Sequence, residues 1–283
     1  MSDTAIELEH DVLLFDLDGV VYVGPHAVPG AVTAIAAAAA RGVRCCFVTN
    51  NASRTPDEVA QHLRDLGVDA TAQDVVTSSQ AGAGLVADRV DSGAVLAVGG
   101  RGVSEALRER GFDPVSTFDS KTVAVMQGYG PDVGWRDLAE ATYAIRSGLP
   151  WIATNLDMTF PTPRGLAPGN GALVGAVAAA VGRRPDGVAG KPEPALLLEA
   201  IRRTGALRPL MIGDRLDTDI AAGGRLGIDT LLVMTGVCDD RGLSKAQGDE
   251  VPTFASVDLA CIESGAPLPT YEPRTWHTRS EGR

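Results

Sequence analysis

The sequence is poor in aromatic side chains, in cysteine and in positive charge. Phe, Trp and Tyr make up only 5% of its 283 residues, whereas alanine and glycine are abundant, so we expect packing through small side chains, as in layered α/β folds. Acidic residues outnumber Lys and Arg by 36 to 25, which gives a formal net charge of −11. Such a surface repels nucleic-acid backbones and anionic lipids, so we predict no nucleic-acid partner and no membrane partner.

Cysteine is limited to four positions, and the apolar runs are short. The thiols show no Cys-x-x-Cys spacing, which argues against a zinc site and is typical of buried, reduced thiols in a cytoplasmic protein. No apolar run approaches the roughly 20 residues that a membrane-spanning helix needs. Residues 1–10 are acidic and lack the apolar core of a signal peptide, so we predict a cytoplasmic location. The cysteines are Cys45, Cys46, Cys238 and Cys261.

What the sequence does contain is an alternation of short apolar runs and amphipathic segments. Residues 12–15 are wholly apolar, as expected for a buried parallel strand. Residues 55–58, Thr-Pro-Asp-Glu, combine a cap residue, a first-turn proline and a capping-box glutamate, which predicts a helix start. The alternation predicts a doubly wound, parallel-sheet α/β fold with right-handed crossovers. Further strands are expected at 43–48, 75–77, 210–212 and 230–234, and further helices at 31–41, 192–204 and 219–226.

The middle of the chain carries an alternation of its own. Strands are expected at 95–98, 123–126 and 151–154, and helices at 103–110, 135–147 and 173–181. We therefore predict an α/β domain inserted into a split core, followed by a flexible tail that is rich in Pro, Arg, Thr and Ser. The predicted boundaries are 1–80 and 189–265 for the core, 81–188 for the insertion and 266–283 for the tail.

Polar side chains with chemical potential cluster at four strand-to-helix junctions. In an open parallel sheet, ligands bind beyond the carboxyl ends of the strands, and each junction places its polar residues on this rim. Several carboxylates on one rim repel one another unless a cation lies between them, and an all-oxygen ligand set suits magnesium. A lysine at such a junction supplies the positive charge that an acidic protein needs to bind phosphate. The junctions are Asp16-Leu17-Asp18-Gly19, Thr49-Asn50-Asn51, Gly190-Lys191-Pro192 and the segment from Gly213 to Asp219.

Each junction also has an ordinary structural explanation when it is taken alone. Asp-x-Asp-Gly forms turns, Asn and Asp cap backbone groups, and a lone lysine is usually solvated. Four such junctions in this order are improbable as coincidence, which favours the functional interpretation. By contrast, Gly99-Gly100-Arg101-Gly102 is only a partial dinucleotide fingerprint, because Glu105 replaces the third glycine. We interpret that segment as a turn between a strand and a helix.

In this order the junctions resemble the four motifs of the haloacid dehalogenase (HAD) superfamily, which implies a Rossmann-like core. The insertion is similar to the α/β cap of the subgroup that includes p-nitrophenyl, phosphoglycolate and pyridoxal phosphate phosphatases. Residues 48–54 (Val-Thr-Asn-Asn-Ala-Ser-Arg) and 168–171 (Pro-Gly-Asn-Gly) strengthen the resemblance. It extends to about Val237 and looks closest to actinobacterial glycerol-3-phosphate phosphatases. One departure is Val20, since many phosphatases of the family carry threonine there.

The resemblance implies a magnesium-dependent phosphatase that acts on small phosphorylated metabolites. Asp16 would attack phosphorus to form an aspartyl phosphate, and Asp18 would protonate the leaving alcohol and then activate water. Magnesium would be held by Asp16, the backbone carbonyl of Asp18 and Asp214, with Asp219 supporting its water shell. The residues that would hold the transferring phosphoryl group are Thr49, Asn50 and Lys191.

Substrate choice is expected to lie in the inserted domain, where residues 155–171 are rich in turn formers. Its polar candidates are Asn155, Asp157, Arg164 and Asn170, although loop capping explains each of them equally well. Of these, Asn155, Arg164 and Asn170 are the predicted substrate-binding residues. The resemblance favours glycerol 3-phosphate, and phosphoglycolate, pyridoxal phosphate and nucleotides remain open alternatives. Other classes are a phosphotransferase or mutase and a non-catalytic binding module, and the intact carboxylates argue against the last. Caps of this kind can serve as dimer surfaces, which leaves a homodimer open.

Overall fold

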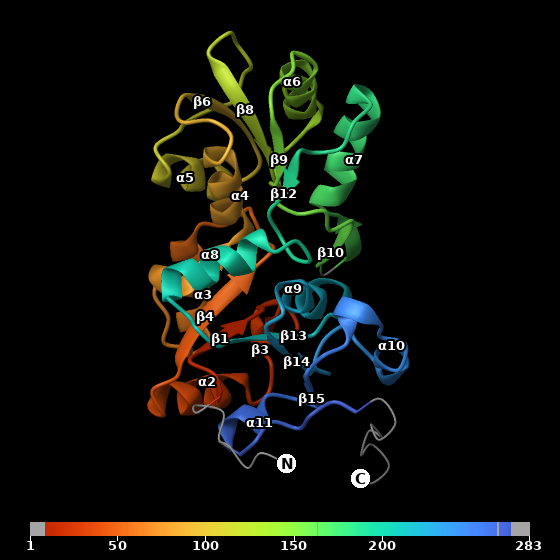
Figure 1. The fold of residues 1–283 in the computed structure, drawn as a ribbon. Coiled ribbons are helices and arrows are strands. Elements are labelled where there is room, and N and C mark those ends of the chain that lie inside the picture. The colour runs from red at the N-terminus through yellow and green to blue at the C-terminus, as the bar shows by residue number, and fades with distance from the viewer. Residues whose placement is uncertain (1–8, 163, 265, 273–283) are drawn as a thin grey trace. The chain divides into compact units, whose positions relative to one another are not determined.

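The structure, a computed structural model, describes residues 9–162, 164–264 and 266–272 (Figure 1). The chain divides into two compact units. The division falls at the end of strand β4 (Arg44–Thr49), within helices α3 (Pro56–Asp65) and α8 (Ala195–Thr204), and between Asp74 and Val75. The first unit comprises Met1–Val48, Ala60–Asp74 and Ala200–Arg283, and the second comprises Thr49–Val59 and Val75–Glu199.

A parallel sheet forms the centre of the first unit, with its strands in the order β15-β14-β13-β1-β4. Strand β1 (Val12–Phe15) is buried along its whole length, because all four side chains are apolar and it pairs with a strand on each side. This confirms the strand predicted at residues 12–15. The other strands and turns of the unit are β2 (Tyr22–Val23), β3 (His26–Ala27), η1 (Ala72–Asp74), β13 (Pro209–Gly213), η2 (Leu216–Ile220), β14 (Asp229–Val233), η3 (Gly248–Glu250) and β15 (Phe254–Ser256).

Helices α2 (Ala31–Ala40), α9 (Ala221–Leu226), α10 (Asp240–Leu243) and α11 (Ala260–Glu263) complete the first unit. The helix predicted at 219–226 differs from the structure at its start. It begins as the π-helical turn η2 and becomes α-helical only at Ala221. Such π-helical turns are rare in proteins, and many of those that occur lie at functional sites. This one contains Asp219.

The second unit has a parallel sheet of its own, with the order β12-β9-β8-β6-β7. Successive side chains of a strand point to opposite faces, so Val95 of β6 packs in one apolar cluster and Leu96 in another. Helices α4 and α5 cover the first face, and α6 and α7 cover the second (Figure 1). The elements are β5 (Val75–Thr77), α4 (Ser78–Ala87), β6 (Ala94–Val98), α5 (Arg101–Glu109), β7 (Asp113–Val115), β8 (Thr122–Gln127), α6 (Trp135–Arg146), β9 (Trp151–Ala153), α7 (Asn170–Val181) and β12 (Gly187–Val188).

All six elements predicted in the middle of the chain are confirmed, but a hairpin was missed. Strands β10 (Thr159–Thr162) and β11 (Gly165–Pro168) pair antiparallel within the segment that we expected to consist of turns. The hairpin was missed because its strands contain Pro161, Gly165 and Pro168, and proline and glycine are depleted in strands and favour turns. The predicted insertion, 81–188, lies inside the second unit, and its exact limits stay a prediction.

The segment after Gly265 differs in part from the predicted flexible tail. Leu268 and Tyr271 are each only 7% exposed, and the Tyr271 hydroxyl donates a hydrogen bond to the carbonyl of Leu243 at 3.1 Å. Leu268 and Tyr271 therefore pack against the rest of the first unit, which the Pro-rich composition of this segment did not indicate. The rest of the predicted tail, 273–283, lies outside the described residues.

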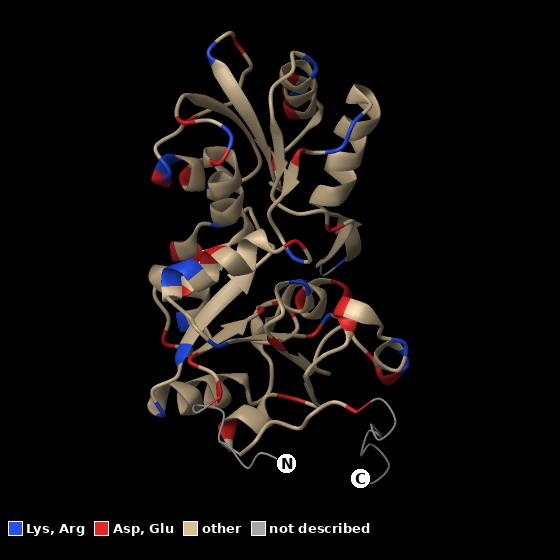
Figure 2. Ribbon diagram, in the orientation of Figure 1, with Lys and Arg blue, Asp and Glu red and all other residues tan. Residues whose placement is uncertain are grey.

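Charged side chains lie mainly on helices and connecting loops, whereas the strands of both sheets are almost free of charge (Figure 2). This agrees with burial of the strands, since an unpaired charge is costly to remove from water. Among the described helices, none is both long enough and apolar enough to cross a lipid bilayer.

Candidate active site

Three aspartates converge at the carboxyl ends of the first unit's central strands. Asp16, Asp214 and Asp219 each offer a carboxylate oxygen, and these oxygens all lie within 4.8 Å of one another. Asp16 follows β1, Asp214 follows β13, and Asp219 lies on the turn that comes next along the chain. The convergence of these three predicted metal ligands is what the strand-end argument requires.

Asp16 and Asp18 lie on a tight loop whose shape is set by backbone hydrogen bonds and by the conformation of Gly19. The amide of Asp16 still donates to the Ile212 carbonyl of β13 at 2.9 Å, so Asp16 continues the sheet ladder. After the buried Leu17, Asp18 is exposed, and Gly19 has a φ of 87°, a left-handed conformation that glycine adopts without strain. The Gly19 amide then donates to the Tyr22 carbonyl at 2.8 Å. The loop thus presents Asp16 half-buried in the cluster and Asp18 at the surface beside it.

Asp214 is held between two glycines and a backbone donor. The amide of Val237 donates to Asp214 Oδ2 at 2.7 Å. A Cβ atom at Gly19 would lie 2.6 Å from the same oxygen, and a Cβ at Gly236 would overlap it. The side chain is only 1% exposed, so its position is determined by packing before any ligand arrives.

Asp219 is held in the same way by a third glycine. A Cβ atom at Gly213 would overlap the Asp219 side chain. The amide of Arg215 donates to Asp219 Oδ2 at 3.2 Å, and the amide of Asp219 donates to the Arg215 carbonyl at the same distance. The π-turn therefore folds Asp219 back onto the end of β13, close to Asp214.

The cluster fits magnesium. Three carboxylates within 4.8 Å of one another repel strongly unless a cation offsets their charge, and two of the three are 1% exposed. The ligand atoms are all oxygen, which magnesium prefers over nitrogen and sulfur. No imidazole or thiol takes part in this group.

Substituting alanine at Gly236 should weaken magnesium binding without unfolding the protein. The added methyl group would displace the Asp214 carboxylate, whereas the backbone at Gly236 has no positive φ that alanine would strain. Changes that disturb the orientation of a metal ligand typically cost 10- to 100-fold in affinity, so we expect about that rise in the Mg²⁺ concentration for half-maximal activity.

The matched control is Gly175→Ala on helix α7, where a Cβ atom meets nothing within 4 Å. It should leave the magnesium requirement unchanged. An unaltered magnesium titration for Gly236→Ala, with a normal melting temperature, would contradict this account of how Asp214 is held.

In the second unit, Asn50 and Lys191 are joined directly. The Lys191 amide donates to Asn50 Oδ1 at 2.8 Å, and Asn50 Nδ2 donates to the Lys191 carbonyl at 3.0 Å. Thr49, at 2% exposed, accepts the Asn51 amide on its hydroxyl oxygen at 3.0 Å, so the hydroxyl hydrogen points elsewhere. The structure thus brings together two of the three predicted phosphoryl-binding residues and places the third next to Asn50 in the chain.

The three predicted substrate-binding residues of the insertion do not form one group. Asn155 Nδ2 donates to the Asn50 carbonyl at 2.7 Å, and Asn170 Nδ2 donates to the Asn155 carbonyl at 2.8 Å. Both side chains are at most 4% exposed, so here they organise the backbone. Arg164 is exposed on the turn of the hairpin β10–β11. Direct contact of any of the three with substrate stays a prediction.

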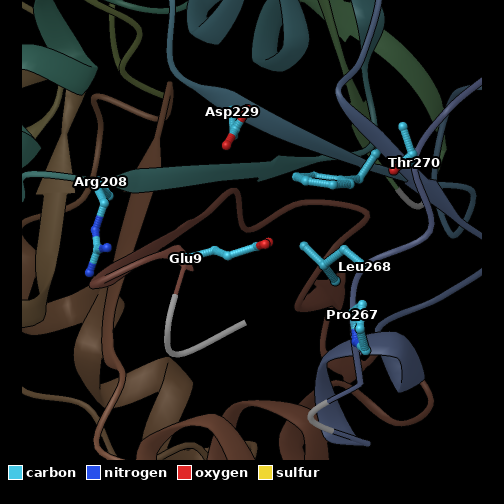
Figure 3. A pocket seen from close by; sticks show the side chains of 7 residues that line it. Glu9, Arg208, Asp229, Pro267, Leu268 and Thr270 are labelled. Atoms are coloured by element: carbon cyan, nitrogen blue, oxygen red, sulfur yellow. The ribbon is translucent and has the colours of Figure 1, made fainter. Parts of the chain in front are cut away.

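A cavity of about 430 Å³ lies at the opposite edge of the first unit's sheet (Figure 3). Its charged lining residues are Glu9, Arg208 and Asp229, which lie just before or at the amino ends of β1, β13 and β14. The acidic cluster lies at the carboxyl ends of the same strands, so the cavity is separate from it. Catalytic chemistry is expected only at the carboxyl ends.

The cysteines offer no competing nucleophile. Burial raises the pKa of Cys45 and Cys46 to about 12 and that of Cys238 to about 11, so these thiols stay protonated at neutral pH. All four cysteines are free, as predicted, but only Cys46 is fully buried. Cys238 follows Val237, whose amide donates to the Asp214 carboxylate, and the amide of Cys238 donates to the Asp214 carbonyl at 3.1 Å. Its protonated thiol takes no part in the group of carboxylates.

The sequence is similar to known protein families and to phosphatases of established activity. Residues 13–113 match the haloacid dehalogenase-like hydrolase family, and residues 188–260 match the HAD-hydrolase-like family. The D-glycerol 3-phosphate phosphatase of Mycobacterium tuberculosis is 44% identical over 271 residues, which cover 95% of this chain and 76% of that protein. The chain belongs to the haloacid dehalogenase-like hydrolases. An acid sugar phosphatase of Staphylococcus aureus is 36% identical, over 89% of this chain and 96% of that protein.

Solved structures of HAD enzymes agree with this assignment. The M. tuberculosis glycerol phosphate phosphatase in complex with magnesium has a TM-score of 0.86 and 45% identity, over 92% of this chain and 78% of that one. The p-nitrophenyl phosphatase of Archaeoglobus fulgidus has a TM-score of 0.83 and 28% identity, over 90% of this chain and 99% of that one. This HAD protein is therefore a phosphoric monoester hydrolase, and magnesium is the cofactor that its relatives and its acidic cluster indicate.

Proposed function

We propose that this HAD phosphatase hydrolyses D-glycerol 3-phosphate to glycerol and inorganic phosphate. The observation that carries the proposal is the 44% identity to the D-glycerol 3-phosphate phosphatase of M. tuberculosis over 95% of this chain. The acidic cluster supports the reaction type, because its geometry fits the ion that was bound in the related structure. A small neutral polyol needs only hydrogen bonds from the protein beyond its phosphate.

We assign the chemical steps to Asp16 and Asp18. A carboxylate oxygen of Asp16 would form a bond to phosphorus while the bond from phosphorus to the glycerol oxygen breaks, and Asp18 would give that oxygen a proton. Asp18 would then take a proton from water as the water oxygen attacks the aspartyl phosphate, which releases phosphate and restores Asp16. The exposure of Asp18, one residue from the buried Leu17, suits a group that exchanges protons with ligand and solvent.

Charge compensation falls to the metal ligands and to Lys191. Asp16, Asp214 and Asp219 would hold magnesium directly or through its water shell, together with the carbonyl of Asp18. When bound, the ion neutralises phosphate charge as a Lewis acid. Lys191 would supply the remaining positive charge, and the Thr49 hydroxyl would donate to a phosphoryl oxygen. The protein's net charge of −11 makes these two positive centres necessary for binding a phosphate dianion.

The test of the substrate is a panel of phosphate esters assayed with magnesium by release of inorganic phosphate. We expect kcat/KM for D-glycerol 3-phosphate to exceed that for phosphoglycolate, pyridoxal phosphate and a nucleoside monophosphate by about tenfold or more, because each 1.4 kcal/mol of better transition-state binding gives a factor of ten. Turnover of p-nitrophenyl phosphate alone would confirm a phosphatase and contradict the substrate.

A sugar phosphate is the second candidate, since relatives 36% identical over 89% of this chain are acid sugar phosphatases. A higher kcat/KM for hexose phosphates than for glycerol 3-phosphate would favour that assignment. We further propose a cytoplasmic enzyme without nucleic-acid or membrane partners, which the acidic composition supports. Its oligomeric state, including a homodimer, is a separate question for light scattering.

A further inference from the structure

The side-chain amide of Asn50 makes three hydrogen bonds inside the second unit. Its Oδ1 accepts the Lys191 amide at 2.8 Å, and its Nδ2 donates to the Lys191 carbonyl at 3.0 Å and to Asp157 Oδ2 at 3.1 Å. Only this orientation of the amide matches its three neighbours, because one is a donor and two are acceptors. One side chain therefore binds both polar groups of a single residue that lies 141 positions away.

These bonds leave the side chain of Asn50 with no hydrogen to donate to a phosphate group in this arrangement. A phosphoryl group at neutral pH offers acceptor oxygens and needs donors from the protein. The two hydrogens of Nδ2 are directed to Lys191 and to Asp157, and Oδ1 has no hydrogen to give. Direct binding, which the sequence resemblance implies for this position, would break one of the two bonds.

The environment of Lys191 is built to keep this contact short. A Cβ atom at Gly190 would lie 2.6 Å from Asn50 Oδ1, 2.8 Å from the Thr154 carbonyl oxygen and 2.9 Å from Asn155 Cβ. Only glycine at position 190 lets the backbone pass so close to Asn50. Lys191 itself is only 3% exposed, so the surrounding residues also restrict movement of its main chain.

The loop after β9 is fixed to the same asparagine. Asn155 Nδ2 donates to the Asn50 carbonyl at 2.7 Å, and Asn155 Oδ1 accepts the Asp157 amide at 3.1 Å. The hydroxyl of Ser78 also donates to the Asn50 carbonyl, at 2.7 Å. Asn50 thus joins three segments that are far apart in sequence, and Lys191 is the one among them that carries a cationic side chain.

We propose that Asn50 is a positioning residue, which acts on the reaction by fixing the main chain of Lys191 and the Asn155–Asp157 loop instead of binding the phosphoryl group. This inference rests on the proposed role of Lys191 in charge compensation. With its N–H and C=O both held, Lys191 starts its side chain from a fixed point, so its ammonium group loses less freedom when it meets an anionic ligand. A misplacement of about 1 Å can cost about 10²-fold in rate, which sets the scale of the expected effect.

A double-mutant cycle between Asn50→Ala and Lys191→Met tests the proposal, with p-nitrophenyl phosphate and glycerol 3-phosphate as substrates. Lys191→Met should lower kcat/KM by about 10²- to 10³-fold, the usual cost of a lost electrostatic stabiliser. Asn50→Ala should lower it by about 10- to 100-fold when Lys191 is present and by less than about threefold in the Lys191→Met background. The coupling arises because the asparagine acts through the lysine.

Asn51→Ala is the matched control, since it removes the neighbouring amide, which caps only its own turn through Ser53. Its effect should multiply with that of Lys191→Met. Equal losses from Asn50→Ala in both backgrounds would overturn the proposal and indicate a direct ligand or a general loss of structure, which the melting temperature distinguishes. If Asn50→Ala does not fold, Asn50→Ser enters the same cycle. A wild-type protein that hydrolyses p-nitrophenyl phosphate but not glycerol 3-phosphate would sink the substrate assignment and leave the cycle measurable.

Discussion

Asp16→Asn is expected to abolish phosphatase activity while leaving the fold intact. The substitution keeps the shape of the side chain but replaces the attacking oxygen by a weakly nucleophilic amide, so kcat should fall by about 10⁴-fold or more. Asp16 lies at the end of β1 and its backbone bond to Ile212 does not involve the side chain, so the sheet should be unaffected. Phosphate release and a thermal melt would be measured on the same preparation.

The covalent step gives this prediction a second observable. Acid-quenched wild-type enzyme, taken during turnover, should show a peptide that contains Asp16 and carries one extra phosphoryl group, and the variant should show none. Asp11→Asn is the control, since Asp11 stands at the other end of β1 and accepts the amides of Leu207 and Arg208. It should retain activity. Residual turnover above about 1% in Asp16→Asn would indicate another nucleophile.

Removal of the metal is expected to have a comparably large effect, on stability as well as on activity. EDTA should stop phosphate release, and Mg²⁺ in excess should restore it. Three clustered carboxylates repel one another without a cation, so magnesium should also stabilise the folded protein. At a Mg²⁺ concentration 100 times Kd, linkage predicts about 2.7 kcal/mol, which corresponds to a rise in Tm of about 5–10 °C for a chain of this size.

Asp214→Asn should remove most of that magnesium-dependent rise in Tm, because it takes away a carboxylate of the cluster that is only 1% exposed and is held between Gly19 and Gly236. The control is Asp217→Asn in the same segment, where the carboxylate is 63% exposed and pairs with Arg215. It should keep the full magnesium response. An equal rise in Tm for Asp214→Asn and wild type would show that the ion binds elsewhere.

The convergence of the acidic residues could be predicted because Asp16 and Asp214 each follow a short apolar strand and Asp219 lies in the segment that continues from Asp214. The family resemblance then implied which of them hold the metal. Strands β1 and β13 consist of residues that are buried on both faces, so their ends could be located within a residue or two, and the polar residues beyond them fell on one rim. Gly213, Gly236 and Gly19 were not recognised as supports of the carboxylates. Their role depends on the approach of side chains from other segments, which no local pattern reveals.

The function of Asn50 was harder to predict for a related reason. The family resemblance implied that Asn50 contacts phosphate, whereas its hydrogen bonds to the main chain of Lys191 follow only from the three-dimensional structure. The hairpin β10–β11 was missed because its Pro and Gly residues locally favour turns, whereas in the structure the two segments pair as antiparallel strands. In both cases a long-range contact decided the outcome.

The order of strands in the first unit has a consequence for how the protein is made. Strand β1 pairs with β4, which follows it closely along the chain, and with β13, which emerges from the ribosome only after the whole second unit. During synthesis the edge of β1 that pairs with β13 therefore stays unpaired until β13 has been made, while the second unit can fold by itself. Asp16 and Asp214 of the acidic cluster are separated by the same delay, so the cluster can assemble only after the second unit has been synthesised.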